Sequence, residues 1–143
     1  MEHPFLENEF RVHWSRLTPE HIEADILKAL DEAQANIDAL AGDIPEELTF
    51  ENTMLPLEDA DSTLGVAWGK VGHLNSVKDS KELREAYNGM LPKVSEFSAK
   101  IPLNAGLWTR IKAYSETEEA RSLTGIRKRY LDETLSSFKS SGA

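Results

Sequence analysis

The chain has 143 residues, of which 40% are hydrophobic and 29% charged, a composition typical of a folded domain and not of a disordered segment. The absence of cysteine excludes disulfides and thiolate metal sites, and the net charge of -9 argues against nucleic-acid binding. No stretch approaches the roughly 18 apolar residues of a membrane helix, and the start MEHPFLENEF lacks a signal-peptide pattern. We therefore expect a cytoplasmic protein without a membrane partner.

The acidic residues are concentrated in the first half. Residues 1–72 carry sixteen acidic and four basic side chains, whereas residues 73–143 carry nine acidic and twelve basic ones. The one basic cluster, Arg127 to Arg129, is short and is followed by Asp132 and Glu133. This pattern favours a solvated helix face over phosphate binding.

The first predicted helix begins at Thr18, Pro19 and Glu20 and ends at Gly42. A hydroxyl cap, a proline in the first turn and an acid near the positive end of the helix dipole are typical of a helix start. Apolar residues then recur at three- and four-residue steps, at Ile22, Ile26, Leu27, Leu30, Ala33, Ile37 and Leu40. We expect residues 1–17 to form an extended segment that packs on the helices through Trp14.

After the GDIP break Thr49 can cap a turn, and the second predicted helix has Pro56 near its beginning. Its apolar stripe consists of Leu57, Ala60, Leu64, Ala67, Trp68, Val71 and Leu74. Gly65, Gly69 and Gly72 lie on the same helix and predict a tight helix crossing. A backbone approach to a ligand is the alternative, less favoured because phosphate-binding glycines lie in strand-to-helix loops.

The stretch GHLNSVKDSKELREAY, residues 72–87, leads from the second helix to the third. His73 is expected to pack at the end of the second helix, and Asn75 and Ser76 to form the turn. Asp79 with Glu82 predicts a capping box. The third stripe consists of Leu83, Ala86, Tyr87, Met90, Leu91, Val94, Phe97 and Ile101, and we expect Pro92 to kink this helix.

Two further helices complete the prediction. A short one from Asn104 carries Leu107, Trp108, Ile111 and Tyr114, and a longer one from about Thr117 carries Leu123, Ile126, Tyr130, Leu131, Leu135 and Phe138. No alternating strand pattern occurs. The sequence therefore predicts an all-α fold of about five amphipathic helices in an antiparallel bundle-like array, residues 1–143 being a single domain.

No catalytic, cofactor-binding or metal residue is assigned from the sequence. A zinc peptidase helix needs HExxH, and that string does not occur; His21 and Glu23 give only a fragment of it. The other histidines, His3, His13 and His73, are isolated in sequence.

Other reactive groups give no specific pattern either. Glu58, Asp59 and Asp61 are three of 25 acids, and neighbouring carboxylates on a helix are typical of a solvated face. There is no GxSxG or SxxK string. Core packing is favoured over ligand stacking for the aromatic residues on the apolar stripes, which are Trp68, Phe97, Trp108 and Tyr130.

Residues 48–98, LTFENTMLPLEDADSTLGVAWGKVGHLNSVKDSKELREAYNGMLPKVSEFS, resemble the N-terminal region of the oligopeptidase A and thimet oligopeptidase family of zinc metallopeptidases, and most closely its bacterial oligopeptidase A branch. The specific strings are FENT, PLE, HLNSVKDSKELREAY and LPKVSEFS, and upstream LTPEHI also matches. The resemblance covers the chain from about residue 13 onward.

The resemblance implies a mostly helical, two-lobed enzyme with a deep channel that admits short peptides. In the family, HExxH and its zinc lie much further along the chain, so no catalytic or zinc-binding residue has a counterpart here. We therefore expect a non-catalytic N-terminal part that forms channel wall, with zinc only in the full-length parent. Its partners would be the rest of the peptidase and, in the full enzyme, short peptides.

Two alternatives remain open. The chain could be a stand-alone α-helical binding module that uses its acidic half to engage a basic partner. It could also be an enzyme in its own right. The ending shortly after Phe138 favours a fragment of a longer chain over a natural short paralogue.

Overall fold

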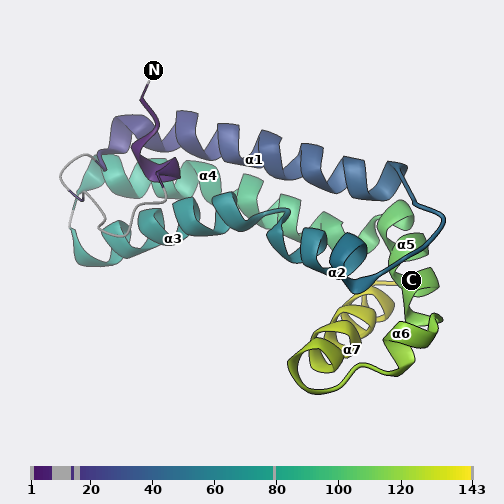
Figure 1. The fold of residues 1–143 in the computed structure, drawn as a ribbon. Coiled ribbons are helices and arrows are strands. Elements are labelled where there is room, and N and C mark those ends of the chain that lie inside the picture. The colour runs from purple at the N-terminus through teal and green to yellow at the C-terminus, as the bar shows by residue number, and fades with distance from the viewer. Residues whose placement is uncertain (1, 8–13, 15–16, 79, 143) are drawn as a thin grey trace. The chain divides into compact units, whose positions relative to one another are not determined.

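The computed structural model describes residues 2–7, 14, 17–78 and 80–142. These residues form α-helices and short 3-10 turns and no strand, which confirms the all-α prediction. The chain divides into two compact units (Figure 1). One comprises Met1–Gln34 with Asp61–Phe97, and the other Ala35–Ala60 with Ser98–Ala143. The expectation of a single domain over residues 1–143 stays a prediction.

The first unit contains the beginning of α1 (Pro19–Gly42), all of α3 (Ser62–Val77) and most of α4 (Lys81–Lys100). Trp68 of α3 stacks on Tyr87 of α4 with ring centroids 4.9 Å apart, so these two helices lie side by side. Their chain directions are opposite (Figure 1). The apolar side chains buried in this unit are Ile22, Ile26, Ala29, Ala33, Leu64, Ala67, Val71, Leu74, Leu83, Met90, Val94 and Phe97, together with Phe5 and Leu17.

Part of the N-terminal segment is described and packs on this unit. The 3-10 turn Pro4–Leu6 buries Phe5, and the Trp14 ring lies 4.9 Å from the His73 ring on α3. Trp14 thus contacts α3, and the packing of residues 1–17 as a whole stays a prediction. The prediction for His13 lies outside the described residues.

The second unit contains the last turns of α1, then α2 (Phe50–Asp59), the 3-10 turn η3 (Ile101–Leu103), α5 (Ala105–Ser115), α6 (Glu118–Arg121) and α7 (Gly125–Ser140). Phe50 of α2 meets Tyr114 and Tyr130 edge to face, each with ring centroids 6.4 Å apart. Trp108 of α5 stacks on Phe138 of α7 at 5.9 Å. Aromatic packing therefore joins α2, α5 and α7.

Local capping signals predicted the helix starts well. Thr49 and Asn52 form a capping box before α2, because each side chain accepts a hydrogen bond from the other residue's backbone N–H. Asn104 accepts from the N–H of Leu107, and Thr117 accepts from that of Ala120. Helix α1 begins at Pro19 and ends at Gly42, as predicted.

Two predicted helices are each divided in the structure. The second one breaks at Ala60 and Asp61 into α2 and α3, and the carbonyl of Ala60 instead accepts a hydrogen bond of 3.0 Å from the side chain of Asn36. The last one breaks into α6 and α7. Gly125 at the start of α7 has a φ of 62°, a conformation that a continuous right-handed helix cannot contain.

The tight crossing predicted at Gly65, Gly69 and Gly72 is wrong. Within the part of the chain that the structure describes, no atom lies within 4 Å of the position that a Cβ would take at any of the three. The close approach occurs in the second unit, where a Cβ on Gly106 of α5 would lie 2.8 Å from the carbonyl oxygen of Ala41. Regularly spaced glycines identify a helix surface that another backbone could approach closely. Only the fold decides whether another helix lies there.

The turn before α4 uses a cap next to the predicted one. Asp79 lies outside the described residues, so its capping box with Glu82 is untested, and Ser80 Oγ accepts a hydrogen bond from the N–H of Leu83. Asn75 and Ser76, which were expected to form the turn, instead lie in the last turn of α3, where Ser76 Oγ donates to the carbonyl of His73. Helix α4 continues through Pro92, and the expected kink stays a prediction. None of the described helices is both long enough and apolar enough to cross a bilayer.

Candidate functional site

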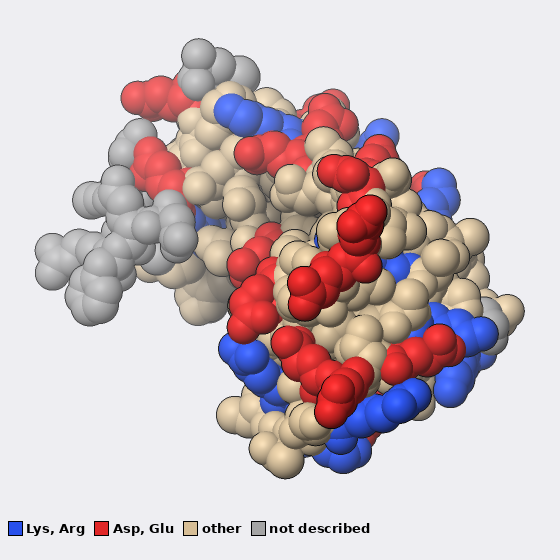
Figure 2. Space-filling view, turned by 45° about the vertical axis from the view of Figure 1, so that its right-hand side comes forward, with Lys and Arg blue, Asp and Glu red and all other residues tan. Residues whose placement is uncertain are grey.

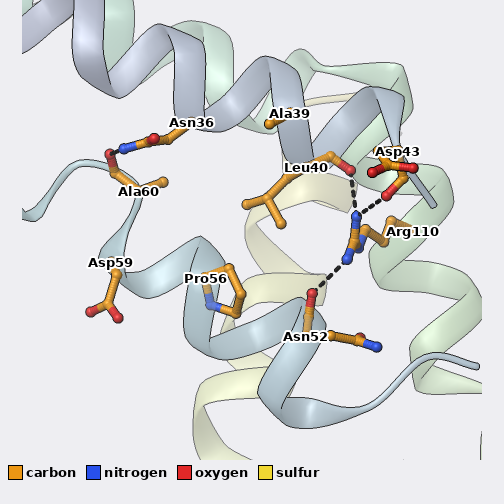
Figure 3. Close-up of a pocket in the computed structure, with 9 residues that line it drawn as sticks. All are labelled: Asn36, Ala39, Leu40, Asp43, Asn52, Pro56, Asp59, Ala60 and Arg110. Atoms are coloured by element: carbon orange, nitrogen blue, oxygen red, sulfur yellow. Dashed lines mark hydrogen bonds between the residues drawn. The ribbon is translucent and has the colours of Figure 1, made fainter. Parts of the chain in front are cut away.

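A buried arginine organises the second unit. Arg110, on α5, is 6% exposed, and its Nη1 donates hydrogen bonds to the carbonyls of Leu40 (2.9 Å) and Asp43 (2.7 Å) at the end of α1. Its Nη2 donates to the carbonyl of Asn52 on α2, and its Nε to Thr53 Oγ1 at 3.5 Å. One guanidinium thus holds three helices together (Figure 3).

The backbone around Arg110 explains why an arginine is suited to this position. The last four carbonyls of α1 have no partner within the helix, and the carbonyl of Asn52 lacks one because Pro56, four residues later, has no N–H; buried carbonyls without partners are costly. A guanidinium offers five donors in a planar fork and can satisfy carbonyls from two helices at once. Burial lowers the pKa of Arg110 from its ordinary value, while the nearby charge of Asp43 acts in the opposite direction.

A groove of about 500 Å³ lies beside this arginine (Figure 3). Apolar lining comes from Ala39 and Leu40 on α1 and from Pro56 and Ala60 at α2. The polar lining residues are Asn36, Asp43, Asn52, Asp59 and Arg110. We call this hollow the α1–α2 groove. It offers an apolar floor with carboxylates beside it, a combination that suits the binding of a ligand. The Arg110 guanidinium, in contrast, donates its hydrogen bonds to protein groups and holds the helices together.

A second polar cluster lies in the first unit. Asp25 is fully buried on α1, and its Oδ1 lies 2.6 Å from Nδ1 of His3, while its Oδ2 accepts a hydrogen bond of 2.9 Å from the N–H of Phe5. Lys70 of α3 donates to the carbonyls of Phe5 and Glu7. Both carboxylate oxygens therefore hold the N-terminal segment, and the cluster acts as a clamp.

Neither the clamp nor the groove was predicted from the sequence. Asp25 had a signal that was available, because it lies three residues after Ile22 and directly before Ile26, on the buried face of α1. Arg110 had no local signal. The carbonyls that it binds lie between 58 and 70 positions earlier in the chain.

Each of the three described histidines weighed in the sequence contacts a residue of another type, and His13 lies outside the described residues. His73 contacts Trp14, His3 contacts Asp25, and His21 Nδ1 lies 3.0 Å from Thr18 Oγ1. Among residues 2–7, 14, 17–78 and 80–142, no three His, Asp or Glu side chains are grouped so that they could hold a metal ion. The donor set that zinc requires is therefore not met by the described part of this chain.

The remaining candidates are the carboxylates, the basic cluster and the aromatic residues, and the contacts described for them are structural. Glu58 and Asp59 are exposed, and Asp61 is the N-terminal flank of α3. In the basic cluster, Arg127 lies over the Phe50 ring and pairs with Glu51, while Lys128 and Arg129 pair with Asp132 and Glu133 one turn later. This confirms the interpretation of the cluster as a helix face. Ring contacts within the units account for Trp68, Trp108 and Tyr130, and Phe97 is buried.

Comparison with known proteins gives a consistent result. The family model described as the N-terminal domain of neurolysin/thimet oligopeptidase matches residues 26–143. Oligopeptidase A of Escherichia coli (strain K12) is 34% identical over 129 residues, which are 90% of this chain and 19% of that protein. Oligopeptidase A of Haemophilus influenzae is 33% identical over 142 residues, which are 99% of this chain and 21% of that protein.

Plant relatives extend the comparison. A probable cytosolic oligopeptidase A of Arabidopsis thaliana is 26% identical over 139 residues, covering 97% of this chain and 20% of that protein. The chain thus spans about a fifth of the length of the relatives that it matches over nearly its whole length.

Proposed function

Because this chain belongs to the neurolysin/thimet oligopeptidase family, as its N-terminal domain, we propose that it forms the helical, non-catalytic part of an oligopeptidase A-like zinc metalloendopeptidase. One observation carries the proposal: the match extends over residues 26–143, while the relatives named oligopeptidase A are about five times longer than this chain. The activity of those relatives then depends mainly on segments that have no counterpart here.

The residues support a scaffolding role. The string HExxH does not occur in the 143 residues. The two buried polar clusters, at Arg110 and Asp25, use their hydrogen bonds to hold the chain's own backbone. In this proposal the domain forms part of the wall of a substrate channel for short peptides, and its main partner is the rest of the peptidase. Zinc would be bound by that other part.

We also propose a cytoplasmic location, which agrees with the absence of cysteine from the sequence. One plant relative is named cytosolic and another, from the same plant, chloroplastic/mitochondrial, so membership in the family alone does not determine the compartment.

The gene itself tests the proposal. Sequencing beyond codon 143 should reveal an open frame that encodes HExxH downstream, and the protein made from that longer frame should cleave a quenched peptide in a zinc-dependent way. A stop codon directly after Ala143 would contradict the proposal and would favour a short paralogue.

The second candidate function is a free-standing helical binding module. The observation that favours it is the charge of residues 35–60, which contain seven acidic residues and no lysine, arginine or histidine. Such a surface attracts cationic partners. A chain encoded alone that still binds a basic peptide would support this candidate over the first.

A further inference from the structure

The α1–α2 groove combines an apolar floor with an acidic rim. We propose that it is a docking site for a basic peptide segment that inserts one apolar side chain. This inference rests on the binding-module candidate and gives it a place on the chain. It can fail while the peptidase-domain proposal stands, because the two are tested by different measurements.

The floor of the groove provides room for a side chain. Ala39 on α1 is exposed, and Ala60 after α2 has the same small side chain, so that neither helix fills the space between them. The volume of about 500 Å³ lies within the range of about 300 to 1,000 Å³ that ligand pockets commonly have. Leu40 and Pro56 add apolar surface, and Figure 3 shows Leu40 pointing into the groove. An aliphatic or aromatic side chain would bury its surface here.

The polar groups at the two ends of the groove are already engaged within the protein. At one end, Asn36 Nδ2 donates to the carbonyl of Ala60 at 3.0 Å. At the other end, Arg110 donates to the carbonyls of Leu40, Asp43 and Asn52. Since these polar groups already have partners within the protein, discrimination between ligands must come from the shape of the floor and from the charges beside it.

The charges beside the floor are negative. Asp43 and Asp59 line the groove and are exposed, and Arg110, the cation in the lining, is 6% exposed. The same segment carries further exposed acids at Asp38, Glu46, Glu47, Glu51 and Glu58. Figure 2 shows a face of the molecule on which acidic side chains gather, with residues other than Lys, Arg, Asp and Glu between them.

Electrostatic complementarity therefore selects the occupant. Lysine or arginine side chains next to an inserted apolar residue would meet Asp43 and Asp59, whereas acidic peptides and nucleic acids would be repelled. Arg127 already pairs with Glu51, so the surface attracts a cation of the chain itself. Exposed carboxylates of this kind mainly raise the association rate and make binding dependent on salt, while the apolar side chain supplies the specific contact.

Fluorescence anisotropy on the full 143-residue chain tests the inference. The probe is a short fluorescein-labelled peptide of lysines around one central leucine. Two comparison peptides replace the leucine by serine or the lysines by glutamates. We expect the leucine peptide to bind most tightly and the glutamate peptide not to bind measurably. Absence of binding by the lysine–leucine peptide, or equal binding of all three, would overturn the inference.

Three variants locate the site. Ala39→Trp should fill the groove and weaken binding of the lysine–leucine peptide by about tenfold or more. Asp43→Asn combined with Asp59→Asn should weaken it by roughly three- to tenfold. The matched control, Glu23→Gln with Asp31→Asn, removes two exposed charges from the part of α1 in the other unit and should change affinity by less than about twofold.

The contrary outcomes are distinct. An equal loss of affinity in the two double variants that remove charges would mean that overall charge alone binds the peptide. Unchanged binding by Ala39→Trp would mean that the peptide does not use the groove. Either result would overturn the inference. Circular dichroism and a thermal melt confirm that each variant is folded. If Ala39→Trp melts early, Ala39→Arg obstructs the groove from the same exposed helical position and carries the same expectation.

Discussion

Arg110 Nη1 donates a hydrogen bond of 2.9 Å to the backbone carbonyl of Leu40, which lies 70 positions earlier in the chain. The same guanidinium reaches Asp43 and Asn52, so the end of α1, α2 and α5 share one cationic centre. The bond to Leu40 is buried, so this carbonyl has no easy access to water when the guanidinium is removed, whereas the bonds to Asp43 and Asn52 are part-buried. The second unit therefore depends on this residue for its assembly.

We expect Arg110→Ala to lower the free energy of unfolding by about 3 kcal/mol or more, since it leaves the buried carbonyl of Leu40 and the part-buried carbonyls of Asp43 and Asn52 without their donor. Arg110→Lys should recover only part of that loss, because an ammonium cannot reproduce the planar fork. Urea denaturation followed by circular dichroism measures both. The control is Arg129→Ala, which removes an exposed pair with Glu133 and should cost less than about 1 kcal/mol. A similar small cost for Arg110→Ala would contradict the assignment.

Two glycines in helices should respond to alanine in opposite directions. At Gly69 of α3 a Cβ meets no atom within 4 Å, so Gly69→Ala should stabilise the chain by about 0.5 to 1 kcal/mol through helix propensity. At Gly106 of α5 a Cβ would lie 2.8 Å from the carbonyl oxygen of Ala41 and 2.9 Å from its Cβ, so Gly106→Ala should destabilise by about 1 to 3 kcal/mol. Thermal melts of the two variants check the pair. Stabilisation by both would show that α1 and α5 are not in close contact.

The clamp at Asp25 should control the N-terminal segment. Asp25→Asn replaces one oxygen acceptor by an amide donor and removes the charge that faces His3, so we expect a loss of about 1 to 3 kcal/mol. Hydrogen exchange at the amide of Phe5 should also become faster. Asp31→Asn, an exposed change on the same helix, is the control and should leave both quantities nearly unchanged. Unaltered exchange at Phe5 in Asp25→Asn would rule out the clamp.

Tyr114 predicts a dependence of stability on alkaline pH. Burial raises the pKa of its phenol above the ordinary value of 10.0, and the hydrogen bond that it donates to Glu119 at 2.9 Å raises it further. Below the unfolded-state pKa of about 10 the phenol is neutral in both states. Above it the unfolded chain loses the proton first, so the free energy of unfolding falls as pH increases.

The Tyr114→Phe variant isolates this effect. It should cost about 1 kcal/mol near pH 8 through the lost hydrogen bond, and this difference from the unsubstituted chain should shrink between about pH 10 and about pH 11. Urea titrations at each of these pH values measure the difference between the two chains. Tyr87→Phe, at a half-buried tyrosine, is the control. A difference that stays constant with pH would show that Tyr114 ionises alike in the folded and unfolded chain.

Local signals in the sequence predicted most helix starts, because a cap is formed by residues within one turn. Thr49, Asn104 and Thr117 each cap the helix that follows. The breaks were harder to predict. The apolar stripe continues from α2 into α3, and the break at Ala60 coincides with a hydrogen bond to Asn36, which lies 24 positions away. Gly125 shows a similar limit, since a glycine in a helical pattern does not disclose the sign of its φ.

The candidate site could be predicted only in part. The acidic character of residues 35–60 is visible in the composition, but the groove that it borders also needs Arg110, which comes from a helix much later in the chain and bonds to both α1 and α2. In the sequence, an arginine that will be buried cannot be distinguished from an exposed arginine until its partners are known. The resemblance to the peptidase family was visible because long ordered strings of residues agree, and the comparisons confirm it.

The most direct test of a non-catalytic domain is a peptidase assay on the purified 143-residue chain with added zinc and a quenched fluorescent peptide. A full-length zinc peptidase serves as the positive control, and a chelator is added in parallel. We expect the rate with this chain to equal that of buffer alone, with or without chelator. Cleavage that persists through repurification, is abolished by the chelator and is restored by zinc would contradict the account.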